Sequence, residues 1–144
     1  MALRTCQTLA QSNVCMKIDC YEIGVYPRRL WVVIGDDMNE IKKTFTYQNG
    51  DEIDLSNEID LSLAMTISVA HKKTGKFGCL VWFSDTSEMS ADIVAHESVH
   101  AALSVFNAVQ CYVTYDNQEP FAYLVSWMVG KIQESKEKCL KKVK

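Results

Sequence analysis

The first half of the chain alternates short apolar segments with turn residues, a pattern typical of β-strands. Apolar side chains alternate with polar ones at the start of 17–26, and 30–34 is a continuous apolar run bounded by Gly and Asp. We therefore expect strands at 17–26, 30–34 and 45–47. The segment 36–44, with an aspartate cap and an acidic first turn, predicts a short helix between the last two strands.

The clearest strand pair in the sequence is formed by two apolar runs, 61–70 and 76–83. The polar segment 71–75 joins them, and its Gly75 can adopt the positive φ that a tight turn requires. These features predict a β-hairpin. The acidic segment 51–60, which precedes the hairpin, is expected to be a surface connection.

Helical periodicity begins after 84–88. Asp85 and Glu88 have the spacing of a capping box, and Ser87 is an alternative cap. The predicted apolar stripe of this helix consists of Ala95, Val99, Ala102, Leu103 and Phe106.

A second helix is expected to begin near Asn117, with Pro120 tolerated in its first turn. Its predicted core side consists of Phe121, Leu124, Val125, Met128 and Ile132. Small residues recur every four positions at Ala122, Ser126 and Gly130, which predicts close packing of this seam on the first helix.

These elements predict an α+β fold, with a small antiparallel-leaning sheet packed on two long C-terminal helices. A length of 144 residues suits one domain. We place that domain at 16–144, because the first predicted strand begins there. The polar leader 1–15 is interpreted as a possible disordered N-terminal extension.

Composition narrows the class of protein. Apolar residues make up 48% of the chain and charged residues 23%, as in ordinary globular domains. The net charge of −3 argues against a nucleic-acid partner, and no apolar run is long enough for a membrane span. Without a signal-peptide pattern or a C-x-x-C pair, the six cysteines are interpreted as reduced thiols of a cytoplasmic protein.

The chemistry is concentrated in an H-E-x-x-H motif formed by His96, Glu97 and His100. Four residues advance a helix by about 400°, so both imidazoles project from one face, about one turn apart. By composition alone, a chain with these residue counts would contain this motif in about 0.4% of cases. Two imidazoles so placed can share a Zn²⁺ ion.

The motif assigns different roles to its members. His96 and His100 are the predicted metal ligands, whereas Glu97 lies about 100° away around the helix, within reach of a zinc-activated water. Glu97 would accept a proton from that water as it attacks a carbonyl, and would then pass the proton to the leaving amine.

A catalytic zinc site needs a third protein ligand. Glu119, in the first turn of the second helix and separated from His100 by 18 intervening residues, is the preferred candidate. Asp116 is the second choice and His71 the third, and a thiolate contact from Cys111 is also conceivable, although a buried apolar thiol is the simpler interpretation.

This pattern resembles the gluzincin metallopeptidases, the thermolysin-like zincins, over about 85–132. Their H-E-x-x-H helix is followed by a metal-binding Glu on a later helix. The segment 117–124 also resembles the Glu-containing helix of ImmA/IrrE-type peptidases, and minimal single-domain gluzincins of similar size exist. The resemblance implies that His96, His100 and Glu119 bind Zn²⁺ and that Glu97 is the general base.

The resemblance further implies an extended peptide substrate that pairs with a strand beside the active-site helix. The run 76–83 is one candidate for that strand, with a buried core strand as the alternative. The chain lacks the thermolysin sequence around the third ligand and its transition-state histidine, so Tyr112, Tyr115 and Tyr123 are candidates for oxyanion stabilisation.

Three functional hypotheses follow from the sequence. The first is a zinc metallopeptidase that acts on a peptide or protein substrate. The second is a non-catalytic regulatory or protein-binding module on a zincin scaffold, because the chain is small and lacks a transition-state histidine. The third is a metal-free structural or assembly protein, in which the motif would be accidental.

Overall fold

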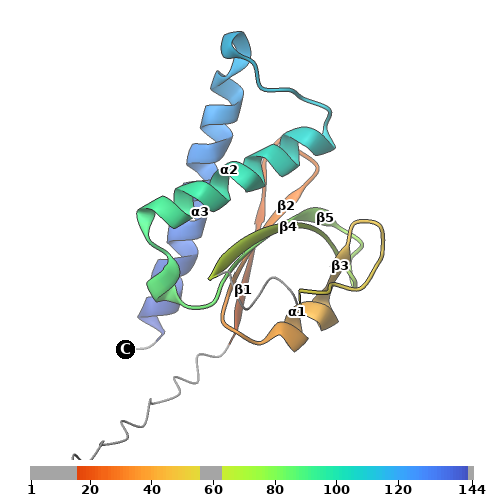
Figure 1. Cartoon of the computed structure of the whole chain (residues 1–144), viewed down its shortest axis with the longest axis vertical. Helices are drawn as coiled ribbons and strands as arrows, with labels where there is room; N and C mark the ends of the chain where they lie inside the picture. Colours follow the sequence, from red (N-terminus) through yellow and green to blue (C-terminus); the bar gives the residue numbers. More distant parts are fainter. Residues whose placement is uncertain (1–15, 56–62, 143–144) are drawn as a thin grey trace, which may run out of the picture.

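The computed structural model describes residues 16–55 and 63–142, so the predicted extension 1–15 lies outside the described residues (Figure 1). The elements confirm an α+β fold with the long helices at the C-terminal end of the chain. In chain order they are β1 (Lys17–Glu22), β2 (Arg29–Ile34), α1 (Met38–Thr44), β3 (Phe45–Tyr47), β4 (Ala64–His71), β5 (Phe77–Phe83), α2 (Ala91–Ala108) and α3 (Glu119–Lys141).

The five strands form one sheet in the order β1-β2-β5-β4-β3. Three of the neighbouring pairs are antiparallel, but β2 and β5 are parallel, with Leu30 opposite Cys79 and Ile34 opposite Phe83. The sheet is therefore mixed, which corrects the expected antiparallel-leaning sheet. The parallel pair arises because the chain crosses from β2 to the far edge of the sheet before β4 and β5 return to its centre.

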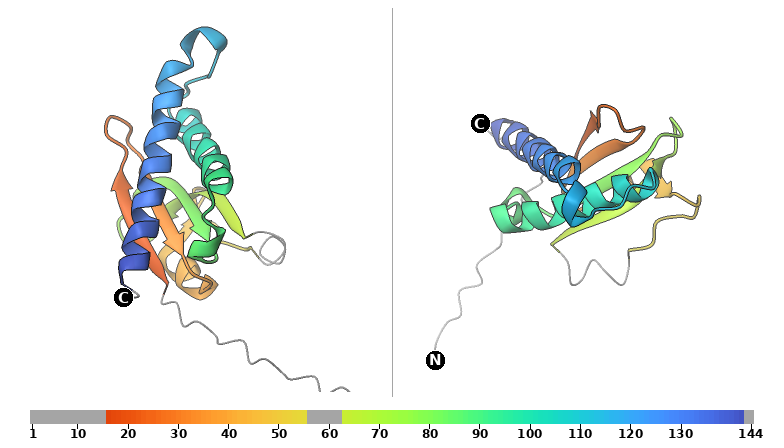
Figure 2. Two further views of the ribbon diagram at one scale, coloured as in Figure 1. Left: turned by 90° about the vertical axis from the view of Figure 1, so that its left-hand side faces the viewer. Right: turned by 90° about the horizontal axis from the view of Figure 1, so that it is seen from above.

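Helices α2 and α3 cover one face of the sheet, and α1 lies on the other (Figures 1 and 2). Residues of β2 and β5 alternate between the two faces, as strand geometry requires. Val32 and Val81 join the core under the long helices, whereas Trp31 and Leu80 join the core near α1. Because both faces are covered, β2 and β5 are almost completely buried.

Close approach of β2 and β5 requires a glycine. A Cβ atom at Gly78 would collide with the backbone carbonyl of Arg29 and with the ring of Trp31. The β4–β5 hairpin forms as predicted, and Gly75 at its turn has a φ of +65°.

Local capping explains where α1 begins. The carboxylate of Asp37 accepts hydrogen bonds from the backbone N–H groups of Asn39 and Glu40, at 3.1 and 3.3 Å. This side chain satisfies donors that have no partner within the helix. The predicted aspartate-capped helix is confirmed, although it begins at Met38 rather than at position 36.

The predicted cap of α2 is wrong. Asp85 instead caps a separate 3-10 turn, Thr86–Glu88, where its carboxylate accepts a hydrogen bond of 2.8 Å from the Ser87 N–H. That bond lowers the pKa of Asp85 below its usual value. Helix α2 starts later, at Ala91, with Ser90 as its N-cap residue.

Helix α3 packs along α2 and reaches β1 at its C-terminal end. Its predicted core side is confirmed: Leu124, Met128 and Ile132 are buried. Near its end, the Ser135 hydroxyl shares a hydrogen bond of 2.8 Å with Tyr21 of β1. The predicted small-residue seam is wrong, because Ala122, Ser126 and Gly130 are all exposed and larger residues make the contact. None of the helices in the described ranges combines the length and apolarity needed to cross a membrane.

The four cysteines that fall within the described ranges are free thiols. Cys79 and Cys139 are buried, and burial raises the pKa of Cys79 to about 12. Cys20 and Cys111 are exposed, so the interpretation of Cys111 as a buried apolar thiol is wrong.

Candidate metal centre

The two histidines of the motif lie side by side on the exposed surface of α2. Their Nε2 atoms are 3.1 Å apart, and the ring centroids are separated by 4.7 Å. Both side chains are exposed. The helical spacing of His96 and His100 therefore brings together the two nitrogens that could bind one ion.

The separation of these nitrogens suits zinc. Two ligands at about 2.0–2.1 Å from a tetrahedral Zn²⁺ ion lie about 3.3 Å from each other. The observed Nε2–Nε2 distance of 3.1 Å is slightly shorter than that value. A small rotation of either imidazole ring would remove the difference. The pair therefore fits two of the three protein ligands of a catalytic zinc site.

Glu97 has a different environment from its neighbours. Its side chain is only 7% exposed and lies between α2 and β4. The Thr66 hydroxyl donates a hydrogen bond of 2.6 Å to Oε2 of Glu97, and it also lies 3.3 Å from the Glu97 backbone carbonyl oxygen. One residue of the motif is thus held against the sheet, while both histidines face outward.

The buried face of α2 is only partly the predicted one: Ala102 and Phe106 are buried as expected, but Ala95 is exposed. Val99 and Leu103 are 39% and 44% exposed, although we expected them in the core. The buried residues are Val94, Glu97, Ser98, Ala101, Ala102, Val105 and Phe106. The helix carries apolar residues on more than one side, and the face with small residues packs against the sheet. Because this face of α2 packs against the sheet, the Glu97 side chain points inward and the two histidines remain accessible.

Sequence reasoning missed the polar contacts between α2 and β4. Thr66 contacts Glu97, and one step along the same face the hydroxyls of Ser68 and Ser104 lie 2.7 Å apart. Thr66 and Ser68 alternate in the sequence with Met65 and Ile67. This alternation could have indicated the contacts from the sequence. It places two hydroxyl side chains on one face of the strand, and polar groups that a helix covers need hydrogen-bond partners.

The predicted third ligand is not beside the histidines. Glu119 is the first residue of α3 and is exposed. Throughout 16–55 and 63–142, no cluster of three or more His, Cys, Asp or Glu side chains is positioned to hold a metal ion. The histidine pair therefore fits zinc as a partial site, and the role of Glu119 stays a prediction.

The other candidate ligands, all within the described residues, likewise form no three-residue metal-binding group with the pair. Asp116 and Cys111 are exposed in the segment between α2 and α3. His71 ends β4, where its ring stacks on Trp31 at 6.0 Å and its Nδ1 accepts a hydrogen bond from the Thr74 N–H. His71 is thus half-buried and held by its own hairpin.

The segment between α2 and α3 is stabilised by its own hydrogen bonds. Every residue of 110–120 is exposed. The Asn117 side chain accepts bonds from the Thr114 N–H and hydroxyl, and donates to the carbonyl of Tyr112. The three tyrosines that are candidates for oxyanion stabilisation are all exposed: Tyr112 is 78%, Tyr115 is 87% and Tyr123 is 74% exposed.

The structure also decides which strand could pair with a peptide. β5 lies inside the sheet between β2 and β4, so its prediction as a substrate-pairing edge is wrong and the core alternative is correct. β3 pairs only with the Val69–His71 end of β4. Within the part of the chain that the structure describes, residues 64–68 of β4 pair with β5 on one side and have no strand partner on the other.

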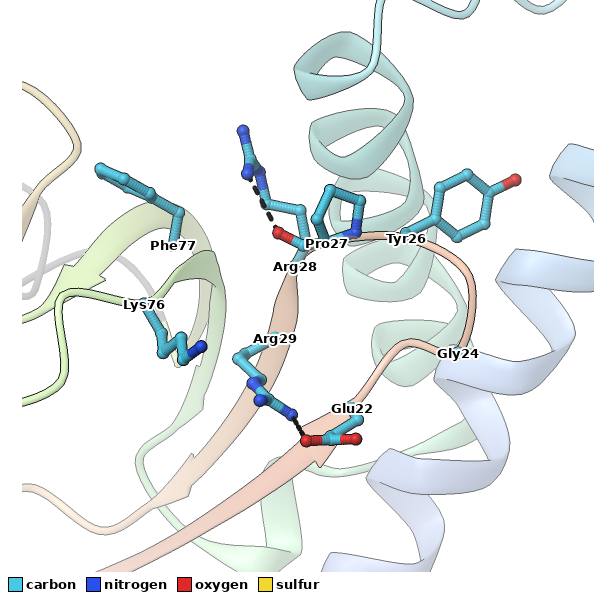
Figure 3. Close-up of a pocket in the computed structure, with 8 residues that line it drawn as sticks. All are labelled: Glu22, Gly24, Tyr26, Pro27, Arg28, Arg29, Lys76 and Phe77. Atoms are coloured by element: carbon cyan, nitrogen blue, oxygen red, sulfur yellow. Dashed lines mark hydrogen bonds and ion pairs between the residues drawn. The ribbon is translucent and has the colours of Figure 1, made fainter.

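Two hollows lie at the β1–β2 turn, and neither is lined by a residue of the motif. The first, of about 210 Å³, contains the Arg29–Glu22 ion pair, and the Arg28 guanidinium lies 5.7 Å from the Phe77 ring centroid (Figure 3). The second, of about 340 Å³, is more apolar and lies between that turn and α3.

Comparison of the chain with protein-family models, with curated proteins and with solved structures gives no match. Function is therefore inferred from the residues of this chain and their geometry.

Proposed function

We propose that this protein is a zinc-dependent peptidase of the zincin type, in which Glu97 is the general base. The observation that carries the proposal is the arrangement on α2. Two histidine nitrogens 3.1 Å apart face outward, and a carboxylate held by the sheet follows the first histidine directly in the chain.

In this proposal, His96 and His100 hold the metal, and Glu119 completes the ligand set. When bound, zinc would polarise the substrate carbonyl and make a water molecule more acidic. Glu97 then accepts a proton from the attacking water and delivers it to the leaving amide nitrogen. Its carboxylate is supported by a partly buried hydrogen bond, so little reorientation is needed during the reaction.

The proposed substrate is a peptide in extended conformation. Residues 64–68 of β4 lie against α2 through Thr66, and one edge of this segment has no strand partner among the described residues. A peptide could add to this edge by backbone hydrogen bonding, as in other cases of β-augmentation. The scissile bond would then lie beside the motif helix.

Metal analysis and a cleavage assay test this proposal together. The full-length chain, purified at neutral pH and dialysed against trace zinc, should retain one zinc ion per chain. It should cleave members of a random peptide library, and removal of zinc by a chelator should stop cleavage until zinc is restored. A chain that retains no stoichiometric zinc would contradict the proposal.

A second candidate function is a non-catalytic binding module on a zincin scaffold. It is favoured by the position of Glu119, away from the histidines, and by the exposed tyrosines of the neighbouring segment. Exposed aromatic side chains are common in protein interfaces. A zinc-loaded chain that leaves the whole peptide library intact would favour this alternative.

A further inference from the structure

Thr66 makes a specific contact with the proposed general base. Its hydroxyl oxygen is 2.6 Å from Oε2 of Glu97 and 3.3 Å from the Glu97 backbone carbonyl. A hydroxyl has one proton to donate, and the shorter distance to the charged acceptor makes Oε2 its partner. The contact joins two elements that are 31 residues apart in sequence.

This contact matters because Glu97 is buried. A carboxylate that is only 7% exposed is costly unless it accepts hydrogen bonds. Among the residues that the structure describes, Thr66 is the one side chain that donates to the Glu97 carboxylate. The orientation of that carboxylate therefore depends on Thr66.

Thr66 itself is held firmly. It lies within β4, where the sheet pairs it with Val81 of β5, and its side chain points toward α2. A β-branched side chain on a strand has few accessible rotamers. The hydroxyl is therefore presented to Glu97 from a rigid position.

We infer that Thr66 is a positioning residue, which occupies Oε2 of Glu97 and leaves Oε1 to accept the proton. This inference rests on the proposed peptidase function. In the reaction, the water oxygen bonds to the substrate carbonyl carbon while its proton moves to Oε1 of Glu97. The same proton then moves to the amide nitrogen as the C–N bond breaks.

The position of Thr66 also connects the base with the substrate. Thr66 lies in the 64–68 segment of β4 that is proposed to pair with the peptide. The backbone of Thr66 would thus belong to the binding edge while its side chain orients Glu97. A peptide in the correct register would lie beside a base that is already oriented.

The test compares three variants of the full-length, zinc-loaded chain. Thr66→Val keeps the shape of the side chain and removes the hydroxyl, whereas Thr66→Ser keeps the hydroxyl. Ser104→Ala is the matched control, because it removes a hydroxyl from the same α2–β4 interface, where Ser104 contacts Ser68 and not Glu97. Zinc affinity, kcat and KM are measured for each variant.

Thr66→Val should lower kcat about tenfold, because one hydrogen bond to a charged group is lost. KM and zinc affinity should stay unchanged, since Thr66 contacts neither the substrate side chains nor the histidines. Thr66→Ser should restore kcat, and Ser104→Ala should leave it unchanged. In a chain that already carries Glu97→Gln, Thr66→Val should cause no further loss of kcat. Equal losses of kcat in the Thr66→Val and Ser104→Ala variants would overturn the inference.

A second measurement separates this inference from the proposed function. Thr66→Val should lower the urea midpoint of unfolding, and it should lower it less in a chain that carries Glu97→Leu. No such difference would overturn the inference directly. If the difference is found but the wild-type chain cleaves nothing, then the hydrogen bond exists, the peptidase proposal fails, and the positioning role fails with it.

Discussion

The two halves of the proposed metal centre are held in different ways. Glu97 is buried against β4 by a 2.6 Å hydrogen bond, and the preceding His96 lies in the middle of a helix packed on the sheet. Glu119 follows an exposed segment, 110–118, whose described side-chain hydrogen bonds are all local. The proposed base and the helix that carries the histidines are held by tertiary contacts, whereas the predicted third ligand follows an exposed segment.

This difference indicates which part of the chemistry is preorganised. A group fixed by packing and hydrogen bonding needs little reorganisation to act, whereas a group on an exposed segment must first be ordered. We therefore expect substitutions near Glu97 to affect catalysis strongly. Changes near Glu119 should chiefly affect metal affinity.

The largest expected effect is that of Glu97→Gln. This change keeps the size of the side chain and its contact with Thr66, but removes the basic oxygen. The rate of peptide cleavage should fall by roughly 10²–10⁴-fold, the usual contribution of a general base. Zinc content, measured in parallel by atomic spectroscopy, should stay at one ion per chain. A variant that keeps its activity would show that Glu97 is not the base.

A matched pair of valine substitutions tests whether α2 is more tightly packed than the exposed segment before α3. Val105 is buried in α2, whereas Val113 is 39% exposed in the segment before α3. Val105→Ala should lower the free energy of unfolding by about 1.5–3 kcal/mol because buried apolar area is lost. Val113→Ala should change it by no more than about 0.5 kcal/mol. Urea unfolding measures both, and equal effects would show that the segment is packed.

Glu119→Ala should weaken zinc binding by about tenfold or more, because even outer-shell partners of metal ligands contribute that much. Asp116→Asn is the control, because Asp116 lies in the same exposed segment and was the second choice as ligand. Competition with a chromophoric chelator measures both affinities. If only Asp116→Asn weakens binding, the third ligand has been assigned to the wrong carboxylate.

The smallest effect concerns local ordering. Backbone amides of 110–118 should exchange with deuterium much faster than those in the centre of α2, because this segment has few tertiary contacts. Zinc should slow exchange around Glu119 if that residue becomes a ligand. Hydrogen exchange with and without zinc measures both effects, and exchange in this segment that zinc does not alter would contradict ligation by Glu119.

Local patterns predicted most of the individual elements. The aspartate-capped α1, the β4–β5 hairpin and the buried face of α3 were all indicated by short-range signals. The buried face of α2 was not, because its apolar residues do not form one stripe: Val99 and Leu103 are exposed, while Ser98 and Glu97 are buried. Periodicity alone cannot choose between two partly apolar faces of one helix.

By itself, the sequence determined which residues form the motif and that the two histidines lie side by side, since both depend on residue type and on helical geometry within one turn. The tertiary structure alone decided that β5 is central, that β2 and β5 are parallel, and that Thr66 faces Glu97. These are relations between residues tens of positions apart. They depend on which faces pack together, and that depends on the whole core rather than on any local segment.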